Sequence, residues 1–235
     1  LGAIDIGDLA PFAKKALADE SVAVRVAGVD LLGVAEQRAE LYPLEKGQDL
    51  VVALEAALVL SQMSMHPGGN VLVADDPSAL GPTVVQRAIA SPKWEVRAGA
   101  ANMLVRLVGH DAATPIAEQL AKDPDAHVQL AAARVLSHDA ATRDQAIAVF
   151  RAQLSGELAT QAAADLAALD ADPEALATLA KLVRDPHRTA DQRAAAATAH
   201  LTAHKITPGL VAALADASGI VRVEAASVLA TLAKD

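Results

Sequence analysis

The sequence predicts an all-α fold, a right-handed α-α superhelix built from about seven helical hairpins. Three observations lead to this prediction. A pattern of Val, then Arg or Gln, then small residues and Leu recurs at intervals close to 32 residues. An Asp or Ser precedes most copies by six residues. Apolar residues make up 53% of the chain but aromatic residues only 2%, so Ala, Leu and Val must form the core. Self-similarity at a fixed period is the signature of stacked repeat proteins.

The position held by Arg or Gln, which we call the anchor, defines each repeat. In chain order the anchors are Arg25, Ala53, Arg97, Gln129, Gln161, Arg193 and Arg222. The interval from Ala53 to Arg97 is the longest, because Gly and Pro interrupt the helical pattern between them. We therefore predict a single domain over residues 1–235, with an irregular insertion at residues 65–82. Since the chain begins at Leu1 rather than Met, we expect a trimmed or processed chain.

Each repeat is expected to be a helix, a tight turn and a second helix. First helices are predicted near residues 9–18, 83–90, 115–122, 142–153, 174–184 and 208–215. Second helices are predicted near residues 22–36, 50–64, 93–108, 126–136, 157–169, 190–203 and 219–233. The recurring Asp or Ser is interpreted as an N-cap, whose side chain accepts an otherwise unpaired backbone N–H. Thr114-Pro115 and Thr207-Pro208 are interpreted as a cap followed by Pro at the first helical position.

The apolar residues of the second helices fall on one face. Val96, Ala100 and Leu104 recur at helical spacing, which is typical of a core stripe. The residue three after the anchor is small in most repeats, which indicates close approach of neighbouring helices. These residues are Ala100, Ala132, Ala164, Ala196 and Ala225.

This pattern resembles the HEAT repeat, in the short bacterial form also seen in proteins similar to bilin lyases (PBS-lyase-type repeats). Val-Arg opening the second helix, an Asp in the preceding turn, and the Ala and Leu that follow carry the resemblance. It implies a superhelix that serves as an interaction scaffold. It also implies a ladder in which each Arg bonds to an Asp or to carbonyls in the turn of a neighbouring repeat. The ladder residues are Asp19, Arg25, Arg97, Asp123, Arg193, Asp216 and Arg222. Binding of an anionic ligand by these arginines stays open as the alternative.

A partner-binding surface is predicted along the second helices, which usually line the inner face of such a superhelix. The residues five after the anchor are its candidates, namely Asp30, Asn102, Arg134, Leu166, Thr198 and Ser227, with Arg106 extending the row. Trp94 is either a buried plug or an interface anchor. Val71 and Leu72, in the insertion, belong either to a contact loop or to a tolerated insertion.

No catalytic, metal or cofactor site is predicted. His200 and His204 share a helix face in a geometry that zinc uses, but no third ligand is evident, and His204 is expected to interact with the helix C-terminus. His110 and His138 are expected to close second helices. No nucleophile elbow is present, and Pro67-Gly68-Gly69-Asn70 reads as a turn because no Lys follows it.

Three function classes are compared. A non-enzymatic protein-binding scaffold asks for no special residues, and its partner would be another protein or another domain of the same parent chain. A bilin-lyase-like enzyme or chromophore chaperone is implied only by the resemblance. A DNA-binding helical-repeat protein needs a basic track, which 20 basic against 29 acidic residues disfavours.

Membrane insertion is not expected, because the longest apolar stretch, residues 50–60, contains Glu55 and is shorter than the ~20 residues that a bilayer needs. The compartment is left unassigned. Val221, Val223, Val228 and Leu232 are expected to form an apolar face near the C-terminus. Terminal repeats need a polar cap, so either the parent chain continues or this end self-associates.

Overall fold

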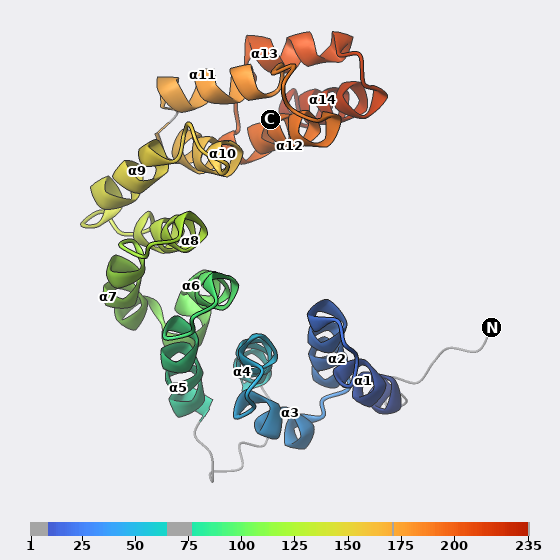
Figure 1. Ribbon diagram of the computed structural model, residues 1–235, viewed down its shortest axis with the longest axis vertical. Coiled ribbons are helices and arrows are strands. Elements are labelled where there is room, and N and C mark those ends of the chain that lie inside the picture. The colour runs from blue at the N-terminus through green and yellow to red at the C-terminus, as the bar shows by residue number, and fades with distance from the viewer. Residues whose placement is uncertain (1–8, 65–76, 171, 235) are drawn as a thin grey trace, which may run out of the picture. The chain divides into compact units, whose positions relative to one another are not determined.

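A computed structural model describes residues 9–64, 77–170 and 172–234, and every regular element in these ranges is a helix (Figure 1). The helices are α1 (Ala10–Leu17), α2 (Val22–Val34), α3 (Arg38–Glu45), α4 (Leu50–Ser64), α5 (Pro77–Ile89), α6 (Trp94–Val108), α7 (His110–Leu120), α8 (Ala126–Leu136), α9 (Arg143–Ala152), α10 (Ala159–Asp170), α11 (Pro173–Leu182), α12 (Ala190–Ala203), α13 (Pro208–Ala212), the 3₁₀ helix η2 (Ala213–Ala215) and α14 (Gly219–Leu232).

Consecutive helices form hairpins, beginning with α1–α2 and ending with α13, η2 and α14. The predicted all-α fold of HEAT-like helical hairpins is confirmed. The chain divides into two compact units, Leu1–Val135 and Leu136–Asp235. In the first unit α2 packs on α4 and α4 on α6, and in the second α10 packs on α12 and α12 on α14. The single domain over residues 1–235 and the right-handed superhelix stay predictions.

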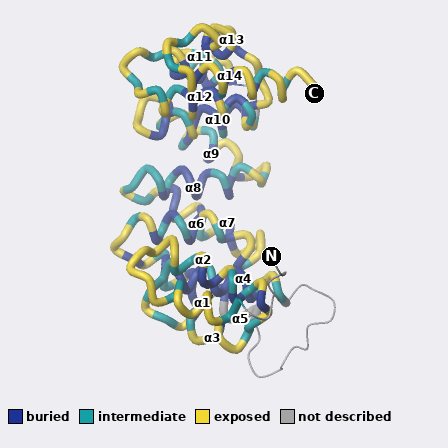
Figure 2. Tube along the Cα trace, turned by 90° about the vertical axis from the view of Figure 1, so that its right-hand side faces the viewer, coloured by how far each residue is buried: buried dark blue, intermediate teal, exposed yellow. Residues whose placement is uncertain are grey.

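Small residues lie where the second helices approach their neighbours. The five alanines three positions after an anchor are all buried, as predicted: Ala100, Ala132, Ala164, Ala196 and Ala225. In the first repeat Gly28 takes this place, and a Cβ there would lie 3.0 Å from the Ala13 carbonyl oxygen. Figure 2 shows the buried residues gathered along the helices within each unit, with exposed residues at the turns. Close helix packing therefore depends on these small side chains.

The ladder aspartates lie in the turns rather than at the N-cap, so the capping prediction is wrong in position. Asp19 Oδ1 accepts the backbone N–H of Ser21 at 2.8 Å, and Asp216 Oδ1 accepts that of Ser218 at 2.8 Å. An Asp side chain that accepts the backbone N–H of the residue two positions ahead forms a local turn. The helix then begins at the residue that follows this N–H donor. Thr207, by contrast, caps α13 as predicted, because its Oγ1 accepts the N–H of Leu210 at 3.2 Å.

Two first helices differ from the prediction. Helix α3 was not predicted, because it contains Pro43 and lacks the Asp/Ser-Pro start. Helix α7 begins at His110 and not near residue 115, so Pro115 lies inside it and His110 opens this helix rather than closing α6. Gly109 adopts φ 77°, a left-handed value, and this lets α6 end and α7 begin with no loop between them.

The predicted insertion is shorter than residues 65–82. Helix α5 begins at Pro77, so the prediction of irregular structure is wrong for residues 77–82. A Pro at the first helical position loses no hydrogen bond, which is why the helix can start there. The rest of the predicted insertion, with Val71 and Leu72, lies outside the described residues.

Candidate interaction surface

Three arginines at anchor positions pair with aspartates in the turn of the next repeat. Arg97 donates from Nε and Nη2 to the two carboxylate oxygens of Asp123, at 2.7 and 2.8 Å. Arg193 makes the same two bonds to Asp216, at 2.9 and 2.8 Å. Arg25 donates to Asp49 Oδ2 from Nε at 3.0 Å and from Nη2 at 2.7 Å. The planar guanidinium suits this geometry because it presents its donors as a fork.

The remaining donor group of each arginine faces its own turn. Arg97 Nη1 donates to the carbonyl oxygens of Ser91 and Pro92, at 2.9 and 3.2 Å. Arg193 Nη1 donates to the Arg188 carbonyl at 2.7 Å. These arginines therefore use their donors on protein groups, which favours the structural interpretation over binding of an anionic ligand. The same hydrogen bonds hold the pKa of Asp123 and of Asp216 below the usual range, because each guanidinium favours the ionised carboxyl.

Where an anchor is not Arg, the turn of the next repeat usually lacks the Asp. Ala53 and Gln129 replace Arg at two anchors, and the following turns carry Ser91 and Ser155 in place of Asp. An Asp there would have no guanidinium to pair with. Asp185 is the exception, since it follows Gln161 and instead lies 3.8 Å from Arg188.

Other arginines link neighbouring repeats at sites that do not recur. Arg151 of α9 donates to Asp172 at 2.6 Å, and this bond lowers the pKa of Asp172. Asp172 also caps α11, accepting the N–H groups of Glu174 and Ala175 at 2.9 and 3.1 Å. Arg87 of α5 donates to carbonyls in the α3–α4 turn. Sequence reasoning missed these links, because they occupy no periodic position.

The predicted partner-binding row lies partly at the surface. Asp30, Asn102, Arg106, Thr198 and Ser227 are exposed, whereas Arg134 is half-buried. Leu166 is 0% exposed, so its place in the row is wrong. Its anchor, Gln161, is the third residue of α10, whereas the other anchors are the fourth of their helices. One residue turns a helix by roughly 100°, which carries Leu166 into the core.

Two charged side chains of this row, Asp30 and Arg106, lie near Glu55 on neighbouring second helices of the first unit. Glu55 of α4 is half-buried, and its carboxyl lies near that of Asp30 on α2. Burial raises the pKa of Glu55, the nearby Asp30 raises it further, and the positive charge of Arg106 on α6 lowers it. We call Asp30, Glu55, Asn102 and Arg106 the polar strip. It offers donors and acceptors of both charges over three helices.

Glu55→Gln is expected to raise the free energy of unfolding at pH 7 by a few tenths of a kcal/mol, because water still screens this carboxyl. A raised pKa in the folded protein means that folding favours the protonated form, so the wild type loses stability as pH rises above about 4.5. The advantage of Gln should vanish near pH 4. Urea unfolding at both pH values measures it. Glu118→Gln, an exposed change on α7, is the control, and an equal effect there would contradict the account.

Trp94 packs against a neighbouring repeat. Its ring stacks on that of His127 with the centroids 4.1 Å apart and the planes at 24°. His127 Nδ1 lies 3.1 Å from Asp125 Oδ1 in the same turn. Trp94 opens α6 and His127 lies in the first turn of α8, so the stacked pair joins two repeats. Of the two alternatives for Trp94, the internal contact is the one that the structure shows, and the ring is half-exposed.

His200 occupies the place of a core leucine. It lies seven residues after its anchor, where other repeats have Leu32, Leu104 and Leu136, and it is 0% exposed. Its Nδ1 lies 2.9 Å from the Ala196 carbonyl oxygen and its Nε2 lies 2.9 Å from Thr207 Oγ1. A carbonyl only accepts, so Nδ1 carries the proton and Nε2 accepts from the threonine hydroxyl. Burial lowers the pKa of this imidazole.

His200 and His204 do not act as a pair. His204 ends α12 in the left-handed conformation, at φ 47°. Among the described residues no group of three or more His, Cys, Asp or Glu side chains is placed to hold a metal ion. Both ring nitrogens of His200 are engaged with protein atoms, which gives this residue a structural role.

Stability is expected to fall on acidification through His200. Its folded-state pKa is depressed, so the unfolded chain binds the proton first, and stability is lost as pH falls below about 6.5. The slope reaches about 1 kcal/mol per pH unit for one such group. His200→Leu should flatten the profile between pH 7.5 and 5.5, measured by urea unfolding. His138→Gln, at an exposed position, should leave it unchanged; equal slopes for both variants would refute this role.

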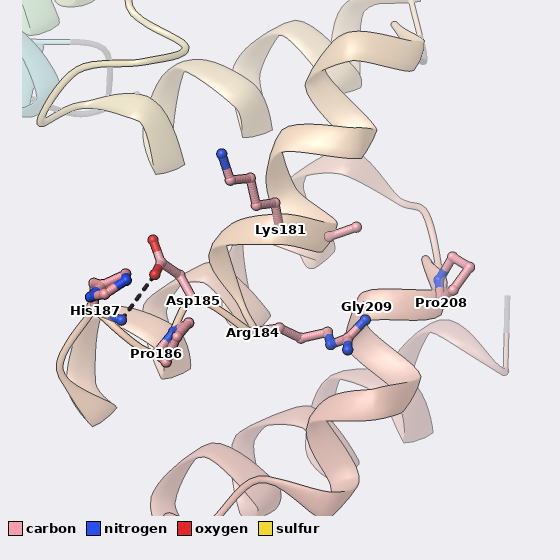
Figure 3. A pocket seen from close by; sticks show the side chains of 8 residues that line it. Lys181, Arg184, Asp185, Pro186, His187, Pro208 and Gly209 are labelled. Carbon is pink, nitrogen blue, oxygen red and sulfur yellow. Dashed lines mark hydrogen bonds between the residues drawn. The ribbon is translucent and has the colours of Figure 1, made fainter.

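An open pocket of about 650 Å³ lies in the second unit between α11 and α13 (Figure 3). The side chain of Arg184 extends toward Pro208 and Gly209, whereas that of Lys181 points away from these two residues (Figure 3). Asp185 is turned back onto its own loop, where Oδ1 accepts the His187 N–H at 2.9 Å. The pocket is thus lined by positively and negatively charged side chains. Its carboxylate, that of Asp185, already accepts a hydrogen bond from its own loop.

Residues 81–158 match the family of HEAT repeats. This stretch carries HEAT repeats. The matched stretch includes the Arg97–Asp123 pair and the stacked Trp94, so one pair of the ladder lies within the repeats that the family match covers. No curated protein matches the chain. Within the part of the chain that the structure describes, no helix is both long and apolar enough to span a membrane.

Proposed function

We propose that the chain is a non-enzymatic scaffold whose HEAT repeats bind a polypeptide through their second helices. The partner is another protein or another domain of the same parent chain. HEAT repeats commonly mediate protein interactions, and stacked repeats present extended surfaces suited to this task. The observation that supports the proposal most is the polar strip, where groups of both charges lie on α2, α4 and α6, half-buried at Glu55 and exposed at the other three residues.

The difference between the paired arginines of the ladder and the exposed polar residues of the second helices supports the same proposal. Arg25, Arg97 and Arg193 use their donors within the repeats. Arg106 and Asn102, by contrast, are exposed on the second helices. A polypeptide presents both donors and acceptors along its backbone, and a strip with both charges can pair with it. A nucleic acid would instead need clustered positive charge, and the net charge of −9 argues against such a ligand. A bilin would need aromatic contacts, and Trp94 is already stacked on His127.

Site-specific photo-crosslinking in the source organism tests the proposal. A photoreactive amino acid replaces Asn102 on α6 in one variant and Glu118 on α7 in the other, both exposed positions. The expected result is a discrete crosslinked protein from position 102 and none from position 118. Adding Arg106→Glu to the first variant should abolish the product. Crosslinking from 118 alone, or a product that Arg106→Glu does not change, would contradict the proposal.

A catalytic role is tested separately. If the chain acts as a scaffold, Arg106→Glu should abolish the crosslink and reproduce the cellular phenotype of a deletion, while the protein stays folded. A variant that loses the crosslinked partner but keeps the function of the wild type in the cell would count against the scaffold function.

A further inference from the structure

The first and the last described repeats carry complementary halves of the Arg–Asp ladder. Within the chain, each arginine pair consists of an anchor and the turn aspartate of the next repeat. The first described repeat has a turn aspartate, Asp19, and the last has an anchor arginine, Arg222. Neither makes this pair within the described residues.

Arg222 is already held in the geometry that its paired equivalents adopt. Its Nη1 donates to the carbonyl oxygens of Asp216 and Ala217, at 2.7 and 3.0 Å. Arg97 makes the same two contacts with its own turn while Nε and Nη2 bind Asp123. In Arg222 the Nε and Nη2 donors have no partner among the described residues, and the side chain is exposed. The donor half of a ladder pair is therefore preformed.

Asp19 is the acceptor half. Its Oδ1 accepts the Ser21 N–H at 2.8 Å, as Asp123 Oδ1 accepts the Asp125 N–H at 2.9 Å. Asp123 in this conformation binds an arginine, whereas Asp19 Oδ2 has no partner within the described ranges. The chain places Ser instead of Asp after the two anchors Ala53 and Gln129, so a turn aspartate usually comes with an arginine to meet it.

Exposed apolar side chains are also found in the first and the last described repeats. The residue after the anchor is buried at Ala98 (8%) and Ala194 (8%) but exposed at Val223 (70%). The residue before the anchor shows the reverse pattern. It is buried at Val128 (0%) but exposed at Val24 (39%). The first and last described repeats thus each display an apolar residue whose equivalents in other repeats are buried.

The predicted apolar face near the C-terminus is corrected by the same comparison. Val221 and Val228 are 0% and 1% exposed, so they belong to the core of the second unit. Val223 is the member that faces outward, together with Ile220 at 59%. The end face therefore differs from the one that the sequence predicted.

We propose that the C-terminal end of one chain binds the N-terminal end of a second copy, head to tail. Arg222 of one copy pairs with Asp19 of the other, and Val223 meets the exposed Val24. The contact continues the ladder across the junction, with the same fork geometry as Arg97 and Asp123. Such an interface is heterologous, so each copy uses two different surfaces.

Charge exchange tests the proposal by sedimentation velocity over a concentration series. The wild type should associate as its concentration rises. Arg222→Glu and Asp19→Arg should each weaken association tenfold or more, because like charges then meet at the junction. A mixture of the two variants should associate again, since each then presents the charge that the other needs. The double variant should also recover association.

Matched apolar changes complete the experiment. Val223→Asp should prevent association, whereas Val105→Asp, an exposed change on α6, should not. A wild type that stays monomeric at the highest concentration would overturn the proposal. Association that Asp19→Arg does not weaken would also overturn it, because the C-terminal ends would then pair with each other. Circular dichroism of each variant shows that the fold is retained.

Discussion

Gly209→Ala is expected to lower the free energy of unfolding by about 3 kcal/mol, the upper part of the range for overpacked sites. A Cβ at this position would lie 2.6 Å from the Ala180 Cα and closer still to the Ala180 carbonyl oxygen. These are backbone atoms of α11, so no side-chain rotation relieves the clash. Helices α11 and α13 would have to separate, and buried neighbours such as Leu210 would lose contacts.

Gly99→Ala is the matched control for this change. Gly99 lies inside α6, and a Cβ there would meet nothing within 4 Å. Because Ala favours the helix over Gly, stability should rise by up to about 1 kcal/mol. Urea unfolding of the two variants should therefore give opposite signs. A Gly209→Ala variant as stable as the wild type would show that α11 and α13 do not approach as closely as described.

Asp123→Ala is expected to cost about 2–3 kcal/mol, because it removes the charged hydrogen bonds to Arg97 and the bond to the Asp125 N–H together. The side chains of Arg97 and Asp123 are 13% and 8% exposed, so little water can replace the lost contacts. Unfolding in urea measures the loss. Glu118→Ala on the exposed face of α7 should change stability little.

A double-mutant cycle separates the pair from the turn. Asp123→Asn keeps an oxygen for the Asp125 N–H but removes the charge, and Arg97→Met keeps the apolar stem. The coupling between these two changes should be about 1–2 kcal/mol, since residues in one hydrogen-bonded pair are not independent. Additive effects would mean that the ladder contributes no stability of its own.

The periodic part of the fold was predictable because each repeat packs against a neighbouring repeat through equivalent positions. An anchor must reach the next turn, and the residue three places later must be small, so the second helices carry a recurring signal. Helix α3 lacks that signal, and Pro43 concealed it. Asp49 was missed because it lies directly before α4 and closer to its anchor, Ala53, than the aspartates of the other repeats lie to theirs.

The candidate surface was predictable only in outline. The spacing identified Asn102 and Arg106, but Glu55 appeared as an interruption of an apolar stretch rather than a neighbour of Asp30. Which helices lie side by side decides that contact, and one helix alone does not show it. His200 could have been found, because it stands in the place of a repeated leucine.

The central claim is that second helices of successive HEAT repeats lie side by side in register. Thr198 of α12 donates to Glu224 of α14 at 2.6 Å, and the chain has no native cysteine. In the variant Thr198→Cys, Glu224→Cys, a short bis-maleimide linker, which adds one thiol at each end, should join the two positions quantitatively. If both thiols react with a maleimide and the helix content is retained, but no crosslink forms, the stacking account is wrong.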